Sequence, residues 1–180
     1  MSDFTNPAGA AKEAAQGYVK ALMDLLGARD PLQVQGGQLA ALEQELSGLS
    51  EEILRRPEKP GKWSILQVLQ HLADSELVSG FRMRMTLAHD SPDIQGYDQD
   101  AWANRLKYND VAPADALDQL RVLRRINLKL LGALEEKQWE RAGMHSERGP
   151  ESIRKLAQMI AGHDLLHLNQ IRRIKQAHGV

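Results

Sequence analysis

Two histidines in the stretch GHDLLHLNQI, His163 and His167, stand four residues apart in an otherwise apolar, helix-like run. On an α-helix such a pair shares one face, with about 6 Å of rise between the two residues. Two imidazoles in that relation can bind one divalent ion, as on the His-Glu-x-x-His helix of zinc enzymes. Asp164 follows the first histidine here, so that metalloprotease motif is not met. The alternative is a pair of buried polar side chains that need hydrogen-bond partners.

A third histidine, His71, lies in the stretch VLQHLADSE, within a second run of helically spaced apolar residues. Taken alone, it fits a hydrogen-bonded core residue. If the two helices pack together, three imidazoles with a water position left open would form a catalytic type of divalent site. Spacing within each helix does not place the helices in contact, so both interpretations stay open.

Acidic and amide side chains near these histidines are candidates for a supporting role. Asp74 lies one turn after His71, and Asp164 and Gln170 flank the other pair. A carboxylate that accepts the outer N–H of an imidazole fixes the ring tautomer and raises its basicity. We predict Asp74 as a catalytic residue, in that role or as a base acting on bound water. The alternative is a solvated or salt-bridged carboxylate, paired with Arg82 on the same helix.

The remaining candidates lie at the ends of helices and in loops. His89, His145 and His178 are predicted to be solvated, although the loop of His145 could fold over a site.

Arginines on the helices and residues on the longest loop are candidates for contact with a substrate. Arg82 and Arg84 could hold an anionic substrate or simply lie in solvent. Tyr97, Asp98 and Trp102 lie on the long segment 89–112, where a lid or a pocket wall is expected.

The elements that must position these residues are helices. Apolar spacing predicts helices over residues 8–26, 31–46, 64–88, 113–136 and 152–179, with shorter turns at 50–54 and near residue 102. No run has the pattern of a strand, and 140–151 is predicted to be a polar loop. The prediction is therefore an all-α four-helix bundle with one or two additional short helices. Residues 1–7 are expected to be disordered, and 8–28 to hold an additional N-terminal helix.

Length and composition restrict the classes of protein. The 180 residues fit one domain over 1–180, with 42% hydrophobic and 26% charged residues. A net charge of −1 gives no argument for binding nucleic acid or an anionic membrane. The absence of cysteine excludes disulfides, thiolate nucleophiles and cysteine-ligated metals. No leader or membrane-spanning run is recognised, so a cytoplasmic protein is expected.

Two of these stretches resemble a known family. GKWSILQVLQHLADSE resembles the signature helix of the DinB-like (DNA-damage-inducible) superfamily of small metal-binding four-helix proteins, and GHDLLHLNQI resembles its C-terminal motif. YDQDAW and HSERGPESIRKLAQMIAGH also resemble one large subgroup, so the resemblance covers about residues 30–175. It implies that His71, His163 and His167 bind a divalent ion, zinc or nickel among others. It also implies a four-helix bundle with a long crossover, often dimeric.

The resemblance suggests an enzyme without fixing its reaction. Characterised relatives include S-transferases that use a low-molecular-weight thiol such as bacillithiol, mycothiol or glutathione, and a thiol-dependent maleylpyruvate isomerase. Other members are described as metal-dependent hydrolases. We therefore expect a metal-dependent enzyme that activates a thiol cosubstrate or water for S-transfer or hydrolysis of a small molecule. The alternative is a non-catalytic metal-binding or helical dimerisation protein. The expected partners are a small-molecule substrate and a second copy of the chain, and neither nucleic acid nor membrane.

Overall fold

The structure of the chain, a computed structural model, describes residues 12–180. The disorder predicted for residues 1–7, and the first four residues of the helix predicted over 8–28, lie outside the described residues. Among residues 12–180, no helix combines the length and the apolar composition that crossing a membrane requires.

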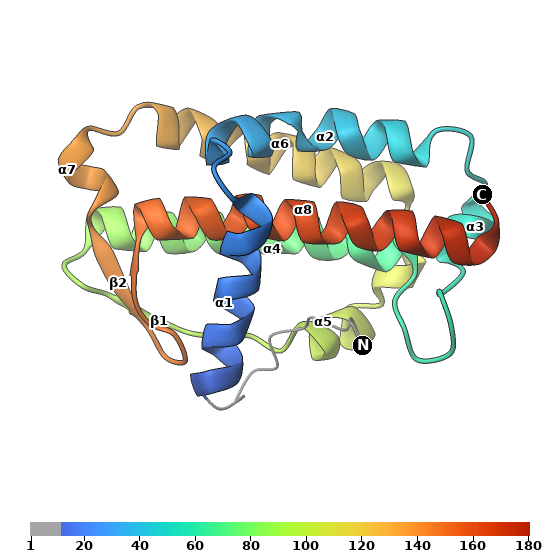
Figure 1. The fold of residues 1–180 in the computed structure, drawn as a ribbon, viewed down its shortest axis with the longest axis horizontal. Coiled ribbons are helices and arrows are strands. Elements are labelled where there is room, and N and C mark those ends of the chain that lie inside the picture. The colour runs from blue at the N-terminus through green and yellow to red at the C-terminus, as the bar shows by residue number, and fades with distance from the viewer. Residues whose placement is uncertain (1–11) are drawn as a thin grey trace.

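Four long helices form the bundle predicted from the sequence. They are α2 (Pro31–Leu46), α4 (Ile65–Ala88), α6 (Pro113–Gly132) and α8 (Ile153–His178). Around the bundle, α2 packs on α8, α8 on α4, α4 on α6 and α6 on α2. Figure 1 shows that α2 and α8 run in one direction and that α4 and α6 run in the other. The prediction of an all-α four-helix bundle is confirmed.

The long segment 89–112 explains why α4 and α6 run in the same direction. After α4 ends, the chain returns along the bundle through α5 (Gln99–Arg105) and the 3₁₀-helix η1 (Tyr108–Asp110). The hydroxyl of Ser64, just before α4, donates to Asn109 Oδ1 at 2.6 Å. The start of α6 is thereby held beside the start of α4, as a crossover connection requires.

Capping residues set the starts of three of the four long helices where the sequence predicts them. Asp30 accepts the N–H groups of Leu32 and Gln33 and caps α2. Ser64 and Gln67 form a capping box at α4. Ser152 caps α8. The end of α6 was predicted less well, because this helix stops at Gly132 and not at residue 136.

Helical segments outside the bundle were predicted in part. Helix α1 (Lys12–Leu26) corresponds to the predicted N-terminal helix, and α3 (Glu51–Arg55) and α5 correspond to the two predicted turns. The 3₁₀-helix η1 and the short helix α7 (Glu136–Trp139) were not predicted. Helix α1 lies across the outside of α8 and is not a member of the bundle (Figure 1).

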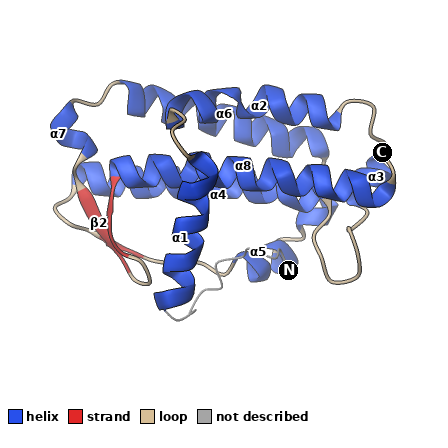
Figure 2. Ribbon diagram, in the orientation of Figure 1, coloured by secondary structure: helices blue, strands red, loops and turns tan. Residues whose placement is uncertain are grey.

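A small sheet contradicts the prediction that the chain has no strand. Strand β1 (Asp93–Ile94) pairs in parallel with β2 (Ala142–His145), which pairs antiparallel with β3 (Gly149–Ser152); the strands are red in Figure 2. Strands of two and four residues are too short to show a clear alternation of apolar residues. Gly149, which suggested a loop, has a φ of +72° and allows the tight return between β2 and β3.

The core is divided into two apolar clusters by a polar layer. One cluster gathers around Leu66, Leu69 and Ile171, and the other around Met83 and Ile153. Between them, the buried residues of α4, α6 and α8 are largely charged or polar. These buried residues are His71, Asp74, Glu76, Arg82, Arg124, Asn127, Asp164 and His167. Such a layer has to be satisfied by internal partners, and it contains the candidate site.

The close approach of α1 to α8 depends on Gly162. A Cβ atom at this position would collide with the backbone carbonyl of Leu22 on α1, and a backbone atom cannot rotate away. We expect Gly162→Ala to lower the free energy of unfolding by about 1–3 kcal/mol and to increase hydrogen exchange in α1. Urea unfolding and exchange mass spectrometry measure the two effects. Gly37→Ala in α2, where a Cβ atom meets nothing within 4 Å, is the control and should be neutral or stabilising. Equal stabilisation by both substitutions would contradict the packing argument.

Candidate metal centre

The bundle brings together the three histidines that the sequence placed on two separate helices. His71 extends from α4, and His163 and His167 extend from the antiparallel α8. The Nε2 atom of His163 lies 3.0 Å from Nε2 of His71 and 3.0 Å from Nε2 of His167. The three could each offer one ligand atom to a shared ion.

Burial keeps these three imidazoles neutral. His71 and His167 are 0% and 2% exposed, and His163 is half-buried at the pocket wall. Burial, reinforced by the neighbouring imidazoles, holds the pKa of His71 and of His163 well below the ordinary value. Burial also lowers the pKa of His167 to about 4, although the hydrogen bond to Gln170 works in the opposite direction. Neutral imidazoles are the form that binds a metal ion, so all three are available as ligands at neutral pH.

The donor set fits a divalent cation better than it fits a hydrogen-bonded cluster. If His167 Nδ1 carries the proton that it shares with Gln170 Oε1 at 2.8 Å, its Nε2 atom presents a lone pair. A proton on His163 Nε2 could then serve only one of that atom's two 3.0 Å contacts. A cation accepts all three lone pairs at once. Imidazole nitrogen suits zinc, nickel and other transition metals.

Polar groups lie beside the triad, and one of them orients a ring. Gln170, a supporting residue suggested by the sequence, holds His167 as described. Ser75 Oγ lies 3.4 Å from His71 Nε2 and 3.0 Å from the Tyr97 hydroxyl. Burial raises the pKa of Tyr97, so its hydroxyl stays protonated at neutral pH. Two hydroxyl groups are thus placed beside the imidazoles.

The structure places Asp74 at the contact between α4 and α6. Its carboxylate accepts hydrogen bonds from the Tyr108 hydroxyl at 2.6 Å and from the side-chain amides of Gln119 and Gln70 at 2.8 and 3.2 Å. No hydrogen bond joins Asp74 to His71 within residues 12–180, and Asp74 is not among the residues that line the pocket. Its catalytic role stays a prediction.

Asp164 also has a different partner from the one that the sequence suggested. It forms a two-point ion pair with Arg124 of α6, at 2.5 and 2.9 Å. The same guanidinium donates to Glu76 of α4 at 3.0 Å. Burial by itself would lower the pKa of Arg124, but Asp164 and Glu76 together raise it above its ordinary value. This buried ion triad joins three helices next to the imidazoles.

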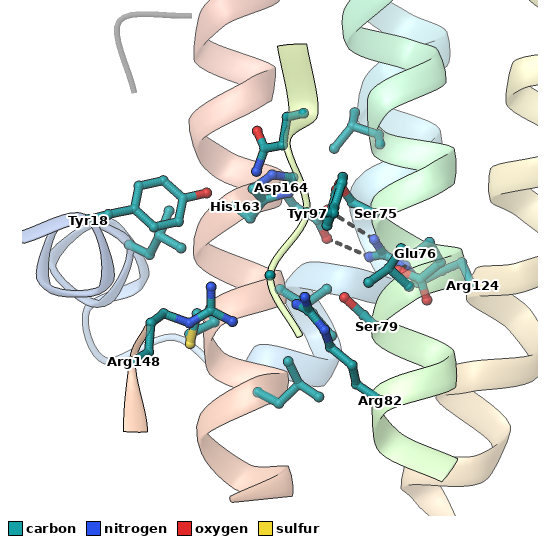
Figure 3. Close-up of a pocket in the computed structure, with 18 residues that line it drawn as sticks. Tyr18, Ser75, Glu76, Ser79, Arg82, Tyr97, Arg124, Arg148, His163 and Asp164 are labelled. Atoms are coloured by element: carbon teal, nitrogen blue, oxygen red, sulfur yellow. Dashed lines mark hydrogen bonds and ion pairs between the residues drawn. The ribbon is translucent and has the colours of Figure 1, made fainter. Parts of the chain in front are cut away.

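A pocket opens beside His163 and holds about 680 Å³ of empty space, including its open mouth. Figure 3 shows side chains that enter it from α1, α4, the crossover, the β2–β3 hairpin and α8. Its polar lining consists of Tyr18, Ser75, Glu76, Ser79, Arg82, Tyr97, Gln99, Arg124, Arg148, His163 and Asp164. Its apolar lining comes from Leu22, Leu72, Val78, Leu156, Met159 and Ile160.

The candidates on the long loop divide into pocket and packing residues. Tyr97 lines the pocket, and the ring of Trp102 packs against it at a centroid distance of 4.6 Å. Asp98 caps α5 by accepting the N–H of Ala101 at 2.9 Å. Arg82 lines the pocket, whereas the exposed Arg84 donates to the carbonyl oxygen of Gly80 and to the side chain of the buried Asn127.

Several pocket residues were missed by the sequence analysis. Ser75 and Ser79 follow His71 at steps of four and share its helical face, which is a signal that could have identified them. Tyr18 and Arg148 come from α1 and from the hairpin, and no local pattern marks either of them.

The prediction that His145 is solvated is wrong. Strand β2 packs its side chain inward, where it is 3% exposed. Its Nδ1 atom accepts the N–H of Glu147 at 3.1 Å, and its Nε2 atom has no hydrogen-bond partner in the part of the chain that the structure describes. His89 is exposed as predicted, and His178 contacts the carbonyl oxygen of Arg56 at 3.2 Å.

His145 should make the protein less stable in mild acid. Burial lowers its pKa to about 4, below the ordinary value of 6.5. Between these values the unfolded chain binds more protons, so stability falls as pH falls from 6.5 towards 4. We expect His145→Asn to reduce this slope by at most about 1.4 kcal/mol per pH unit, measured by urea unfolding from pH 7 to 5. The exposed His89→Asn is the control, and an unchanged slope in the His145 variant would refute the assignment.

Three comparisons with known proteins agree with this architecture. A sequence model of the DinB superfamily matches residues 37–171. A protein of Oceanobacillus iheyensis, OB0782, is 31% identical over 131 residues, which is 72% of this chain and 75% of its own. YfiT of Bacillus subtilis is 31% identical over 108 residues, 60% of this chain and 61% of its own. Both are named "putative metal-dependent hydrolase".

The solved structure of YfiT is similar throughout. It superimposes with a TM-score of 0.74 over 97% of this chain and 94% of the YfiT chain, at 23% identity, and is described as a four-helix bundle of unusual topology. At this identity the likeness supports the fold alone.

Proposed function

The chain belongs to the DinB superfamily, and from this premise we propose that it is a divalent-metal-dependent enzyme that acts on a small molecule. The observation that carries the proposal is the meeting of three neutral imidazole Nε2 atoms, one of which belongs to His163, a residue that lines the pocket. A site of purely structural metal would have no need of an adjoining pocket.

His71, His163 and His167 would hold the ion, with zinc or nickel the proposed metals. A divalent ion in such a site lowers the pKa of a bound water or thiol and so supplies a nucleophile near neutral pH. Gln170 keeps the lone pair of His167 directed at the site. The protonated hydroxyls of Ser75 and Tyr97 can donate hydrogen bonds to a substrate oxygen there.

Hydrolysis is the reaction that we propose first, because the names of the relatives support it. Transfer of a low-molecular-weight thiol is the second candidate, which the earlier resemblance to thiol transferases favours. A chain with no cysteine must take such a thiol from a cosubstrate. A catalytic role for Asp74 is retained as part of the proposal, and Asp74→Asn in the assay below tests it.

We further propose a cytoplasmic homodimer of single-domain chains whose partner is a small-molecule substrate, and neither nucleic acid nor a membrane. The net charge of −1 is consistent with the last two points. Sedimentation velocity tests the dimer.

The decisive experiment compares the purified, the metal-free and the zinc- or nickel-loaded protein. Elemental analysis gives the metal content, and a panel of esters and amides tests hydrolysis. Glutathione and bacillithiol with 1-chloro-2,4-dinitrobenzene test thiol transfer. Turnover with water alone supports a hydrolase, and turnover only with a thiol supports a transferase. Activity that is unchanged after metal removal would refute the proposal. A large fall in melting temperature after chelation, without any activity, would favour a structural metal instead.

A further inference from the structure

One face of α4 runs from the metal centre into the pocket. His71, Ser75, Ser79 and Arg82 follow one another at steps of four, four and three residues, which places them on a single helical stripe. His71 and Arg82 are therefore separated by about 16 Å along the helix axis. Ser75, Ser79 and Arg82 line the pocket, and Figure 3 shows Arg82 reaching into it at the end remote from His163.

Arg82 differs from the two other arginines that line the pocket. Arg124 is neutralised by the ion triad, and Arg148 forms a two-point ion pair with Glu151 at 2.5 and 3.0 Å. Arg82 is only 9% exposed, yet it donates to an uncharged group, the carbonyl oxygen of Gln95, at 2.5 Å. Its guanidinium also lies over the ring of Tyr97, 6.0 Å from the ring centroid. No carboxylate of the described residues forms an ion pair with it.

The groups around Arg82 offset only part of the energetic cost of burying its charge. Burial and the charge of Arg148 lower its pKa, and the charges of Glu151 and Glu147 do not reverse this direction. Arg124 shows the opposite direction, because its carboxylates are in contact with it. His145 lies within electrostatic range of Arg82 and Arg148, and its buried Nε2 atom has no partner in the described part of the chain. The buried guanidinium of Arg82 thus lies near a second cation, Arg148, and has no carboxylate of the described residues in ion-pair contact. A buried cation without a carboxylate partner is stabilised when an anion binds beside it.

The structure assigns to Arg82 the binding of an oxyanion on the small-molecule substrate, at the end remote from the metal centre. This inference rests on the proposed function, since it names the class of molecule that the same pocket takes. The apolar lining provided by Leu156, Met159 and Ile160 suits a carbon chain between the anionic end and the reacting end. The substrate class is therefore an elongated molecule with a carboxylate or similar oxyanion at one end.

A binding experiment on the metal-free, full-length protein tests this assignment without using catalysis. Calorimetry compares 4-phenylbutyrate with its uncharged amide, and inorganic phosphate provides a third probe that separates a carboxylate from a phosphate preference. We expect the carboxylate to bind more tightly than the amide. We expect Arg82→Gln to weaken carboxylate binding between about tenfold and a hundredfold while leaving the amide unchanged. Arg82→Lys should restore part of the loss. Arg84→Gln, which removes a charge from the outside of the same helix, should have less than about a twofold effect.

Failure of this assignment can be distinguished from failure of the proposed function. Zinc affinity and melting temperature of Arg82→Gln are measured in parallel and should match those of the parent protein. Equal affinity for carboxylate and amide in the parent protein, which needs no variant, would overturn the assignment, as would undiminished carboxylate binding by folded Arg82→Gln. Loss of every hydrolase or transferase activity would affect the proposed function but would leave the carboxylate result standing.

Discussion

Replacing His167 with alanine is expected to weaken zinc binding by about two orders of magnitude or more. Groups that merely orient a ligand cost about 10–100-fold when removed, and a ligand should cost at least the upper end of that range. Nε2 of His167 lies 3.0 Å from Nε2 of His163. The substitution therefore removes one of the three nitrogen atoms that would bind the ion. Competition with a chromogenic chelator gives the affinity, and elemental analysis gives the stoichiometry.

Two further variants make the His167 result specific. Gln170→Ala removes the amide that holds His167 Nδ1 at 2.8 Å and should weaken zinc binding by about tenfold. His89→Ala removes an exposed histidine at the end of α4 and should change nothing. Full zinc content and affinity in the His167 variant would exclude the three-histidine site.

The bundle could be predicted because long helices repeat their apolar spacing many times and have recognisable caps. The spacing of α4 and the capping box at Ser64 and Gln67 are both visible in the sequence. The β2–β3 hairpin has four residues in each strand, too few for a periodic signal, and its pairing with Ile94 joins segments about fifty residues apart. The crossing of α1 over α8 depends on the absence of a Cβ atom at Gly162, and no local sequence pattern reveals this contact.

The candidate site was only partly predictable for the same reason. His163 and His167 are related by helical spacing, but the distance between His71 and His163 in the folded chain is set by how α4 and α8 pack. Their association was therefore predicted mainly from resemblance and only partly from spacing. Asp74 shows the limit of spacing alone. It lies one turn from His71 as predicted, yet its carboxylate hydrogen-bonds to Tyr108 and to side chains of α4 and α6.

The polar layer that surrounds the site also carries the largest stability effect that we expect. Arg124 is 3% exposed and is the cation shared by Glu76 and Asp164, which are 2% and 1% exposed. Arg124→Met keeps the length of the side chain but leaves both carboxylates buried without a cation. Breaking a buried ion pair in this way costs about 3–5 kcal/mol, so a melting temperature lower by about 10 °C is expected. Urea unfolding at pH 7 measures the free energy, and differential scanning calorimetry measures the melting temperature.

The origin of that loss can be tested through pH and through the partners of Arg124. Unpaired buried carboxylates have raised pKa values in the folded state, so the variant should recover stability relative to the parent protein as pH is lowered from 8 to 5. Adding Glu76→Gln and Asp164→Asn to Arg124→Met should recover much of the loss at pH 7, because no buried charge is then left unpaired. A single Arg124→Met variant within about 1 kcal/mol of the parent protein would mean that water reaches the layer.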